Sequence, residues 1–346
     1  MERLFSSRPR RIIGVVVLAI VLVAAPLMSS PFINYQLSQI MVFGVAILGL
    51  NIVMGYTGQV SLGQSAFLGL GAYIAAYGVT NGWPIPLTFI LCAVIPALVG
   101  MLVALAAARL RGLALAMITL ALPIVGTPLA RRFVDFTGGS QGVTVSWLAA
   151  PDWSGLANDQ WRYYLVMLIA VICFVLARNL VRGRVGRTFA IVKGNESVAL
   201  SMGVSPYRTK VLAFTIASML GGIAGFMYLA VVQYTSPETL NFFTSINLVA
   251  AMVIGGSASI VGTALGAIYF VMVPVIAGQV SSSRTALISG AILLVVLFVL
   301  PAGLASLPRR IAQLTPAGRR RATPEGLTAP DDPAAPEAAA PSEVTK

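Results

Sequence analysis

A glycine-rich stretch of uncharged polar residues, residues 55–65, lies between two apolar segments. Glycines at such a place allow a helix to break, and a broken helix offers backbone N–H and C=O groups to a ligand. We therefore predict a pathway for a small substrate here, lined by Gly55, Tyr56, Gly58, Gln59, Ser61, Gly63 and Gln64. The alternative is that these small and polar residues only pack helices together through a few side-chain hydrogen bonds.

A second glycine-rich stretch follows late in the chain, at residues 254–259. It is a candidate counterpart of the first break, as in transporters built from two repeats, and its candidate pathway residues are Gly255, Gly256 and Ser257. The internal similarity is weak, so helix packing is the favoured alternative, as it is for the pair Gly221 and Gly225. The stretch 137–142 predicts a tight turn in a loop, with contact to an incoming ligand as the alternative.

A basic segment between two apolar runs has a different pattern. Residues 184–191 and 195–203 read as a short helix, a break, a second short helix and a terminating glycine. Such an element can dock its apolar side into a groove on a partner protein. The alternative is an ordinary basic loop lying on anionic lipid headgroups.

Several residue types that proton coupling or catalysis would need are missing from the apolar segments. They contain no acidic residue and the chain has no histidine, which disfavours a proton relay but leaves sodium coupling open. No lysine is followed by Ser or Thr, so the chain has no phosphate-binding loop of an ATPase. No cluster of acids, bases or metal ligands lies near the lipid, which disfavours a membrane-embedded enzyme. We interpret Cys92 and Cys173 as packing residues.

Composition shows which elements must position these motifs. Only 10% of the residues are charged and 58% are hydrophobic, whereas a soluble domain has about 25% charged residues. The apolar runs do not alternate as barrel strands do, so helices are expected. We predict an all-α polytopic membrane protein with about eight to ten transmembrane helices, of which the third and eighth are broken or re-entrant. The ten segments are 12–29, 37–55, 61–80, 86–108, 112–130, 161–178, 211–233, 244–256, 262–279 and 285–303.

The net charge of +12 follows membrane topology rather than nucleic-acid binding, because the basic residues lie beside the apolar segments. With ten crossings and a cytoplasmic N-terminus, 19 of the 23 basic residues fall on the cytoplasmic side. This predicts a cytoplasmic N-terminus at 1–11, a transmembrane domain at 12–308 with a cytoplasmic coupling loop at about 179–210, and a cytoplasmic, disordered tail at 309–346. We interpret the first apolar run as a span rather than a signal peptide.

Several motifs together resemble the LivM-type permease subunits of branched-chain amino acid ABC importers, from about residue 37 to residue 303. They are Leu50-Asn51 through Tyr73, Arg109–Gly112, Thr137–Gly142, Gly183–Arg187, Asn195–Val204, Lys210–Phe214, and Gly255-Gly256 with Gly262.

The resemblance implies a permease that works with a sister permease, two ATP-binding subunits and an external binding protein in a bacterial inner membrane. It implies that this chain binds no cofactor, and that its partners use ATP and Mg²⁺. It also implies that Arg187, Glu196, Ala199 and Gly203 meet the ATPase. The substrate would be a branched-chain amino acid, which neutral side chains and backbone dipoles can hold. The alternatives are the same machine carrying urea, short amides or other amino acids, and a sodium-coupled carrier or a channel.

Overall fold

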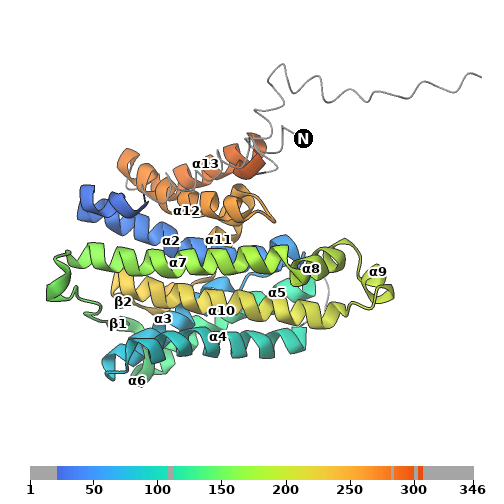
Figure 1. Cartoon of the computed structure of the whole chain (residues 1–346), viewed down its shortest axis with the longest axis horizontal. Helices are drawn as coiled ribbons and strands as arrows, with labels where there is room; N and C mark the ends of the chain where they lie inside the picture. The colour runs from blue at the N-terminus through green and yellow to red at the C-terminus, as the bar shows by residue number, and fades with distance from the viewer. Residues whose placement is uncertain (1–21, 108–112, 282–283, 300–302, 307–346) are drawn as a thin grey trace, which may run out of the picture. The chain divides into compact units, whose positions relative to one another are not determined.

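Almost all of the described chain is helical. The computed structural model describes residues 22–107, 113–281, 284–299 and 303–306 (Figure 1). The longer helices are α2 (Pro31–Leu50), α3 (Gln64–Thr80), α4 (Ile85–Ala107), α5 (Leu113–Arg132), α7 (Asn158–Arg182), α10 (Pro206–Val232), α11 (Phe242–Gly255), α12 (Ile260–Val280) and α13 (Thr285–Val299). Each predicted segment from 37–55 onward corresponds to one of them. The predicted segment 12–29 lies mostly outside the described residues, as do both predicted tails and the motif 109–112.

Short elements connect these helices. They are the π-helix η2 (Asn51–Tyr56), α6 (Val134–Thr137), α8 (Arg184–Gly194), α9 (Glu196–Ser201) and the 3-10 turns η3 (Gly139–Gln141), η4 (Asp152–Ser154), η5 (Pro237–Leu240) and η7 (Leu304–Ser306). Strands β1 (Val143–Thr144) and β2 (Tyr234–Thr235) pair antiparallel, with Val143 opposite Thr235. The predicted turn at 137–142 is present, and its three glycines all have positive φ.

Local signals fix where several helices begin. Pro31 and Pro206 occupy first-turn positions, where proline loses no helical hydrogen bond. The hydroxyl of Ser205 accepts a hydrogen bond from the Arg208 amide and thereby caps α10. Helices α7 and α10 extend further than predicted, to Arg182 and from Pro206, so the predicted coupling loop is shortened to the segment between them.

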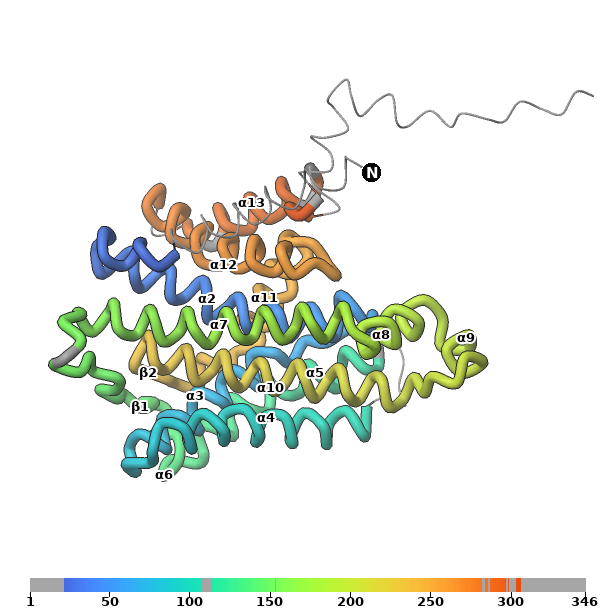
Figure 2. The backbone as a smooth tube through the Cα atoms, in the orientation of Figure 1, coloured from blue at the N-terminus to red at the C-terminus, as the bar shows by residue number. Residues whose placement is uncertain are grey.

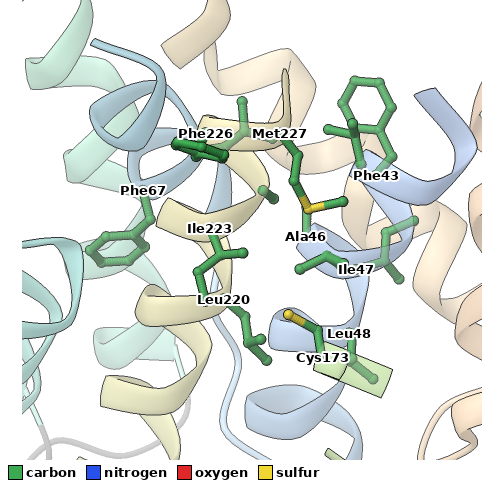
Figure 3. Packing of buried hydrophobic residues seen from close by; sticks show 14 of the residues in the cluster. Phe43, Ala46, Ile47, Leu48, Phe67, Cys173, Leu220, Ile223, Phe226 and Met227 are labelled. Carbon is green, nitrogen blue, oxygen red and sulfur yellow. The ribbon is translucent and has the colours of Figure 1, made fainter. Parts of the chain in front are cut away.

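Helix α10 forms the centre of the packing and contacts α2, α3 and α4 (Figure 1). Small residues allow the close approach: a Cβ on Gly225 would meet the backbone of Leu68 and Ala72 on α3. The glycine pair of α10 therefore packs helices, as predicted. Around it the core is apolar, with residues of α2, α3, α7 and α10 in contact (Figure 3).

The outer surface of the helices is also apolar. Six helices of the described residues are long and apolar enough to cross a membrane: α2 with η2, α4, α5, α7, α10 and α12. Leu102 on α4 is 64% exposed and Leu176 on α7 is 62% exposed. Apolar surface of this extent suits lipid rather than water. Helices α3, with 17 residues, and α11, with 14, are shorter than these six but continuous, and the chain leaves helical geometry before α3 and after α11 rather than within the third and eighth segments.

The two ends of the helices carry different elements. Helix α7 begins after η4 and ends directly before α8, and α10 returns from α9 to β2. The pair α8–α9 and the ribbon β1–β2 therefore lie at opposite ends of these helices (Figure 2).

Candidate functional site

The chain leaves helical geometry at the first glycine-rich stretch. After α2 the backbone widens into η2, a geometry that is frequent at functional sites. The backbone N–H of Gln59 then donates a hydrogen bond to the Val53 carbonyl at 3.1 Å. Gly58 adopts a φ of +72°, which glycine tolerates without steric cost. From Thr57 to Ser61 buried and exposed residues alternate, so that Thr57, Gln59 and Ser61 are buried. We call residues 55–63 the first break.

A second break separates α11 from α12 at residues 256–259. Gly256 has a φ of +118° and Ala258 one of +58°. The hydroxyl of Ser259 accepts a hydrogen bond from the Gly262 amide at 3.0 Å and starts α12. The predicted first break is therefore present, and a break is also present at the second stretch, where helix packing was the favoured interpretation.

The side chain of Asn51 in η2 joins the two breaks. Its amide nitrogen donates to the Ser259 carbonyl at 3.0 Å and to the Thr263 hydroxyl at 2.9 Å. Its oxygen accepts from the backbone amide of Ala258 at 2.9 Å. Asn51 is fully buried, so these bonds replace water at a place where an unpaired amide would be costly.

The close approach of the two breaks requires a glycine at position 55. A Cβ on Gly55 would overlap the Asn51 side-chain oxygen and would lie 2.7 Å from the Ala258 nitrogen. The glycine thus leaves room for the bridge from Asn51, a role that its sequence context did not reveal.

The start of α3 is fixed by buried polar side chains. The Gln64 amide donates to the carbonyls of Ala46 at 3.0 Å and Ala217 at 3.2 Å, and so ties α3 to α2 and α10. The hydroxyls of Ser65 and Ser245 lie 2.7 Å apart and tie α3 to α11. The polar residues that follow the first break therefore make hydrogen bonds between helices.

The predicted pathway residues are only partly brought together. Gly55 lies at the Asn51 bridge, beside the Ala258 amide that follows Ser257, whereas the Gly256 backbone lies against Gly262. Gln64 lies at the start of α3, where its amide makes helix-to-helix bonds. Gly255 packs against the Gly262 backbone, which is a helix-packing contact. Ser61 is buried and Ser257 is exposed. In this conformation Gln59 and Gln64 direct their amides at backbone carbonyls, so contact with a substrate would require the segment to move.

An apolar cavity of about 460 Å³ begins beside the first turn of α3. Its walls come from α3, α4, α5, α6 and η5, and include Ala66, Phe67, Tyr73, Gly126 and Leu240. The Tyr73 hydroxyl is buried and has no hydrogen-bond partner among the described residues. The cavity suits an aliphatic group accompanied by one hydrogen-bonding group.

The predicted short helix, break, short helix and glycine stop are α8, Asn195, α9 and Gly203. The Asn195 side chain caps α9 by accepting from the amides of Ser197 and Val198. Gly203 ends α9 with a φ of +74°, and the Val204 amide bonds back to the Ala199 carbonyl at 2.9 Å.

The four predicted coupling residues lie in different surroundings. Ala199 is fully buried, Arg187 and Gly203 are exposed, and Glu196 is partly buried. Val198, Leu200 and Met202 are exposed and give α9 an apolar outer surface.

Two polar residues of the site were not predicted. No role was predicted for Asn51 beyond its motif, although it is the only Asn of the predicted segment 37–55, and a lone Asn in an apolar helix indicates hydrogen bonds to other helices. Lys193, whose amine lies 2.6 Å from the Gly55 carbonyl, is one of only three lysines in the chain. The scarcity of lysine was the sequence feature that could have singled out Lys193.

Comparisons with known proteins agree with these features. Residues 32–299 match the family model for the permease component of branched-chain amino acid transport systems. The chain is 28% identical to the high-affinity branched-chain amino acid transport system permease protein LivM of Escherichia coli, over 77% of this chain and 68% of that protein. LivM of Salmonella typhimurium is also 28% identical, over 74% of this chain and 66% of that protein. The chain thus spans about two thirds of the length of these relatives.

A more distant relative has another cargo in its name. The autoinducer 2 import system permease protein LsrC of an Enterobacter species is 24% identical, over 65% of both chains. The relatives are named as permeases, that is, transport subunits rather than enzymes.

Proposed function

Since the chain belongs to the family of branched-chain amino acid transport system permease components, we propose that it imports branched-chain amino acids as the LivM-type subunit of an ABC importer. It is a multi-pass membrane protein of the ABC-permease type. ATP hydrolysis, with its Mg²⁺, belongs to partner subunits, and this chain holds no cofactor of its own.

The structural observation that best supports the proposal is the exposed apolar surface of α9. This helix lies at one end of α7 and α10, and its side chains Val198, Leu200 and Met202 are 49%, 63% and 65% exposed. The segment 184–210 carries several basic residues, and in the proposed orientation it faces water, so three exposed apolar side chains are best explained by a protein partner. An ATP-binding subunit is the partner that an ABC permease requires at this surface.

The proposed orientation follows from the same surface. With α8–α9 in the cytoplasm, the basic residues of the loop lie on the side that the positive-inside rule favours. Both termini would then be cytoplasmic and the β1–β2 ribbon would face the external binding protein. The complex would contain a sister permease and two ATP-binding subunits in a bacterial inner membrane.

Two features support a branched-chain substrate. The LivM relatives match more of the chain than the autoinducer 2 permease does, and the cavity beside α3 has an aliphatic and aromatic lining that suits a branched side chain. The first break, with Gly55, Gly58 and Gln59, and the adjoining Gln64 form the proposed pathway for the zwitterionic part. Urea, short amides and other amino acids remain the alternative cargoes of the same machine.

The test is uptake by the full assembly in liposomes. Radiolabelled leucine should accumulate only when ATP is enclosed with the ATP-binding subunits and binding protein is outside. Valine and isoleucine should compete with leucine, whereas urea, acetamide and ribose should not. Uptake by this chain alone in response to a sodium gradient would overturn the proposal.

A further inference from the structure

The helix pair α8–α9 holds the first break at its beginning. Lys193 lies in the last turn of α8, and its amine donates to the Gly55 carbonyl at 2.6 Å. The lysine stem passes over Gly58, where an added Cβ would come within 3.2 Å of the Lys193 Cγ. The glycine at this point therefore gives the lysine access to the carbonyl.

A second, indirect connection runs from α9 through Lys210 of α10 to the end of the same segment. Glu196, in the first turn of α9, pairs with Lys210 of α10 at 2.6 Å, and the Lys210 side chain is 7% exposed. The backbone carbonyl of Lys210 accepts a hydrogen bond from the side-chain amide of Gln59 at 3.4 Å. The Gln59 amide also donates to the Thr57 hydroxyl at 2.8 Å, within the break itself.

The ammonium group of Lys193 is well suited to bind the Gly55 carbonyl. Gly55 belongs to the final turn of η2, where carbonyls lack a helical partner and the helix dipole places partial negative charge. An ammonium group is a donor with full positive charge and satisfies such a carbonyl well. A neutral side chain of the same length would leave the carbonyl to water and would release α8 from the break.

From the first break the connection continues to the second. Asn51 lies one turn before Gly55 and bonds to Ala258, Ser259 and Thr263. Displacement of α8–α9 would therefore pull on both breaks through side chains that are already bonded.

We propose that α8–α9 clamps residues 55–59 at two points, directly through Lys193 and indirectly through Glu196 and its partner Lys210, and that Lys193 is a positioning residue that passes movement of α8–α9 to the break. The clamp is a set of contacts within the permease and does not depend on what the importer carries. Its role in transport rests on the proposed function.

Hydrogen exchange of the assembled importer without nucleotide tests the clamp separately from transport. Lys193→Met should raise exchange of the amides of residues 55–59, because the Gly55 carbonyl loses its partner, whereas Arg184→Met on the same helix should not. Lys193→Arg should give an intermediate rate. Unchanged exchange in Lys193→Met would overturn the clamp whatever the importer carries.

Transport then tests the role of the clamp. Lys193→Met should keep ATP hydrolysis but reduce leucine uptake per ATP by about fivefold or more, the lower end of common coupling energies. Lys193→Cys treated with 2-bromoethylamine, which restores an amine on a side chain of lysine length, should recover uptake per ATP. The parent protein treated in the same way controls for the buried thiols of Cys92 and Cys173. Wild-type uptake per ATP in Lys193→Met would overturn the role, whereas absence of ATP-driven uptake in the wild type would overturn the proposed function instead.

Discussion

The side-chain oxygen of Asn51 accepts a hydrogen bond from the backbone amide of Ala258 at 2.9 Å, across 207 positions of the chain. This bond joins the break between α2 and α3 to the break between α11 and α12, two helices that pack against each other. Transporters built around discontinuous helices place their binding groups at such points. The bond therefore gives the two glycine-rich stretches a common structural role.

Removal of the Asn51 amide should destabilise the junction. Asn51→Leu leaves the Ala258 amide without its partner in a buried place, which costs about 1–3 kcal/mol. We expect a lower thermal unfolding midpoint in detergent. The matched control is Asn81→Leu, at an exposed asparagine that bonds only within its own turn. Equal midpoints for the two variants would contradict the importance of the bridge.

Gly55→Ala should be destabilising although alanine favours helices. The added Cβ would displace the Asn51 side chain, and overpacking of this kind costs about 1–3 kcal/mol. Gly290→Ala, where nothing lies within 4 Å of the added carbon, should be neutral or slightly stabilising. The measurement is the urea dependence of unfolding of both variants in detergent, and a tolerated Gly55→Ala would count against close packing of the two breaks.

The pair Glu196–Lys210 should contribute as a unit. Lys210 is almost fully buried, so Lys210→Met removes a charge-assisted hydrogen bond worth about 1.5–3 kcal/mol. Glu196 is more exposed, and Glu196→Gln should cost less. A double-mutant cycle on the unfolding free energy should show that the two losses are not additive, and strict additivity would mean that the pair does not interact.

Gly203 should be required for its conformation rather than for space. Its φ is +74° and no atom lies within 4 Å of a Cβ built on it. Gly203→Ala should therefore cost about 1–2 kcal/mol of backbone strain, whereas Gly203→Asn should cost less. Gly203→Pro cannot adopt this φ and loses the amide that bonds to Leu200.

A further prediction for Gly203 concerns the coupling of ATP hydrolysis to leucine uptake. Gly203→Pro should uncouple ATP hydrolysis from leucine uptake while the protein remains in the membrane. Its level in the membrane fraction is the control, and unchanged transport would refute the placement of this residue at the ATPase contact.

Leu200 should be an anchor for the ATP-binding subunit. It is exposed on α9, so Leu200→Asp should leave the unfolding midpoint of the permease unchanged. Loss of a central apolar anchor costs about 2 kcal/mol or more in binding, and we expect correspondingly less co-purified ATP-binding subunit. Leu200→Met, which keeps an apolar side chain, should retain binding. Equal recovery with Leu200→Asp would exclude α9 as the contact.

Much of this architecture could be predicted from local sequence. Apolar runs free of charge form helices because a backbone in lipid must satisfy its hydrogen bonds within the same segment. For that reason α4, α5 and α12 lie close to their predicted ranges. Glycine conformations are equally local, so the two breaks and the stop at Gly203 were predictable.

The partners of the polar side chains were decided by the tertiary structure alone. Asn51, Gln59 and Lys193 bond to groups that lie 207, 151 and 138 positions away. Which carbonyl a buried amide or ammonium reaches depends on which helices pack together, and residue types along one segment carry no information about that. The sequence thus located the breaks and the basic helix pair, and only the packing of α2 against α10 and α12 brought them into contact.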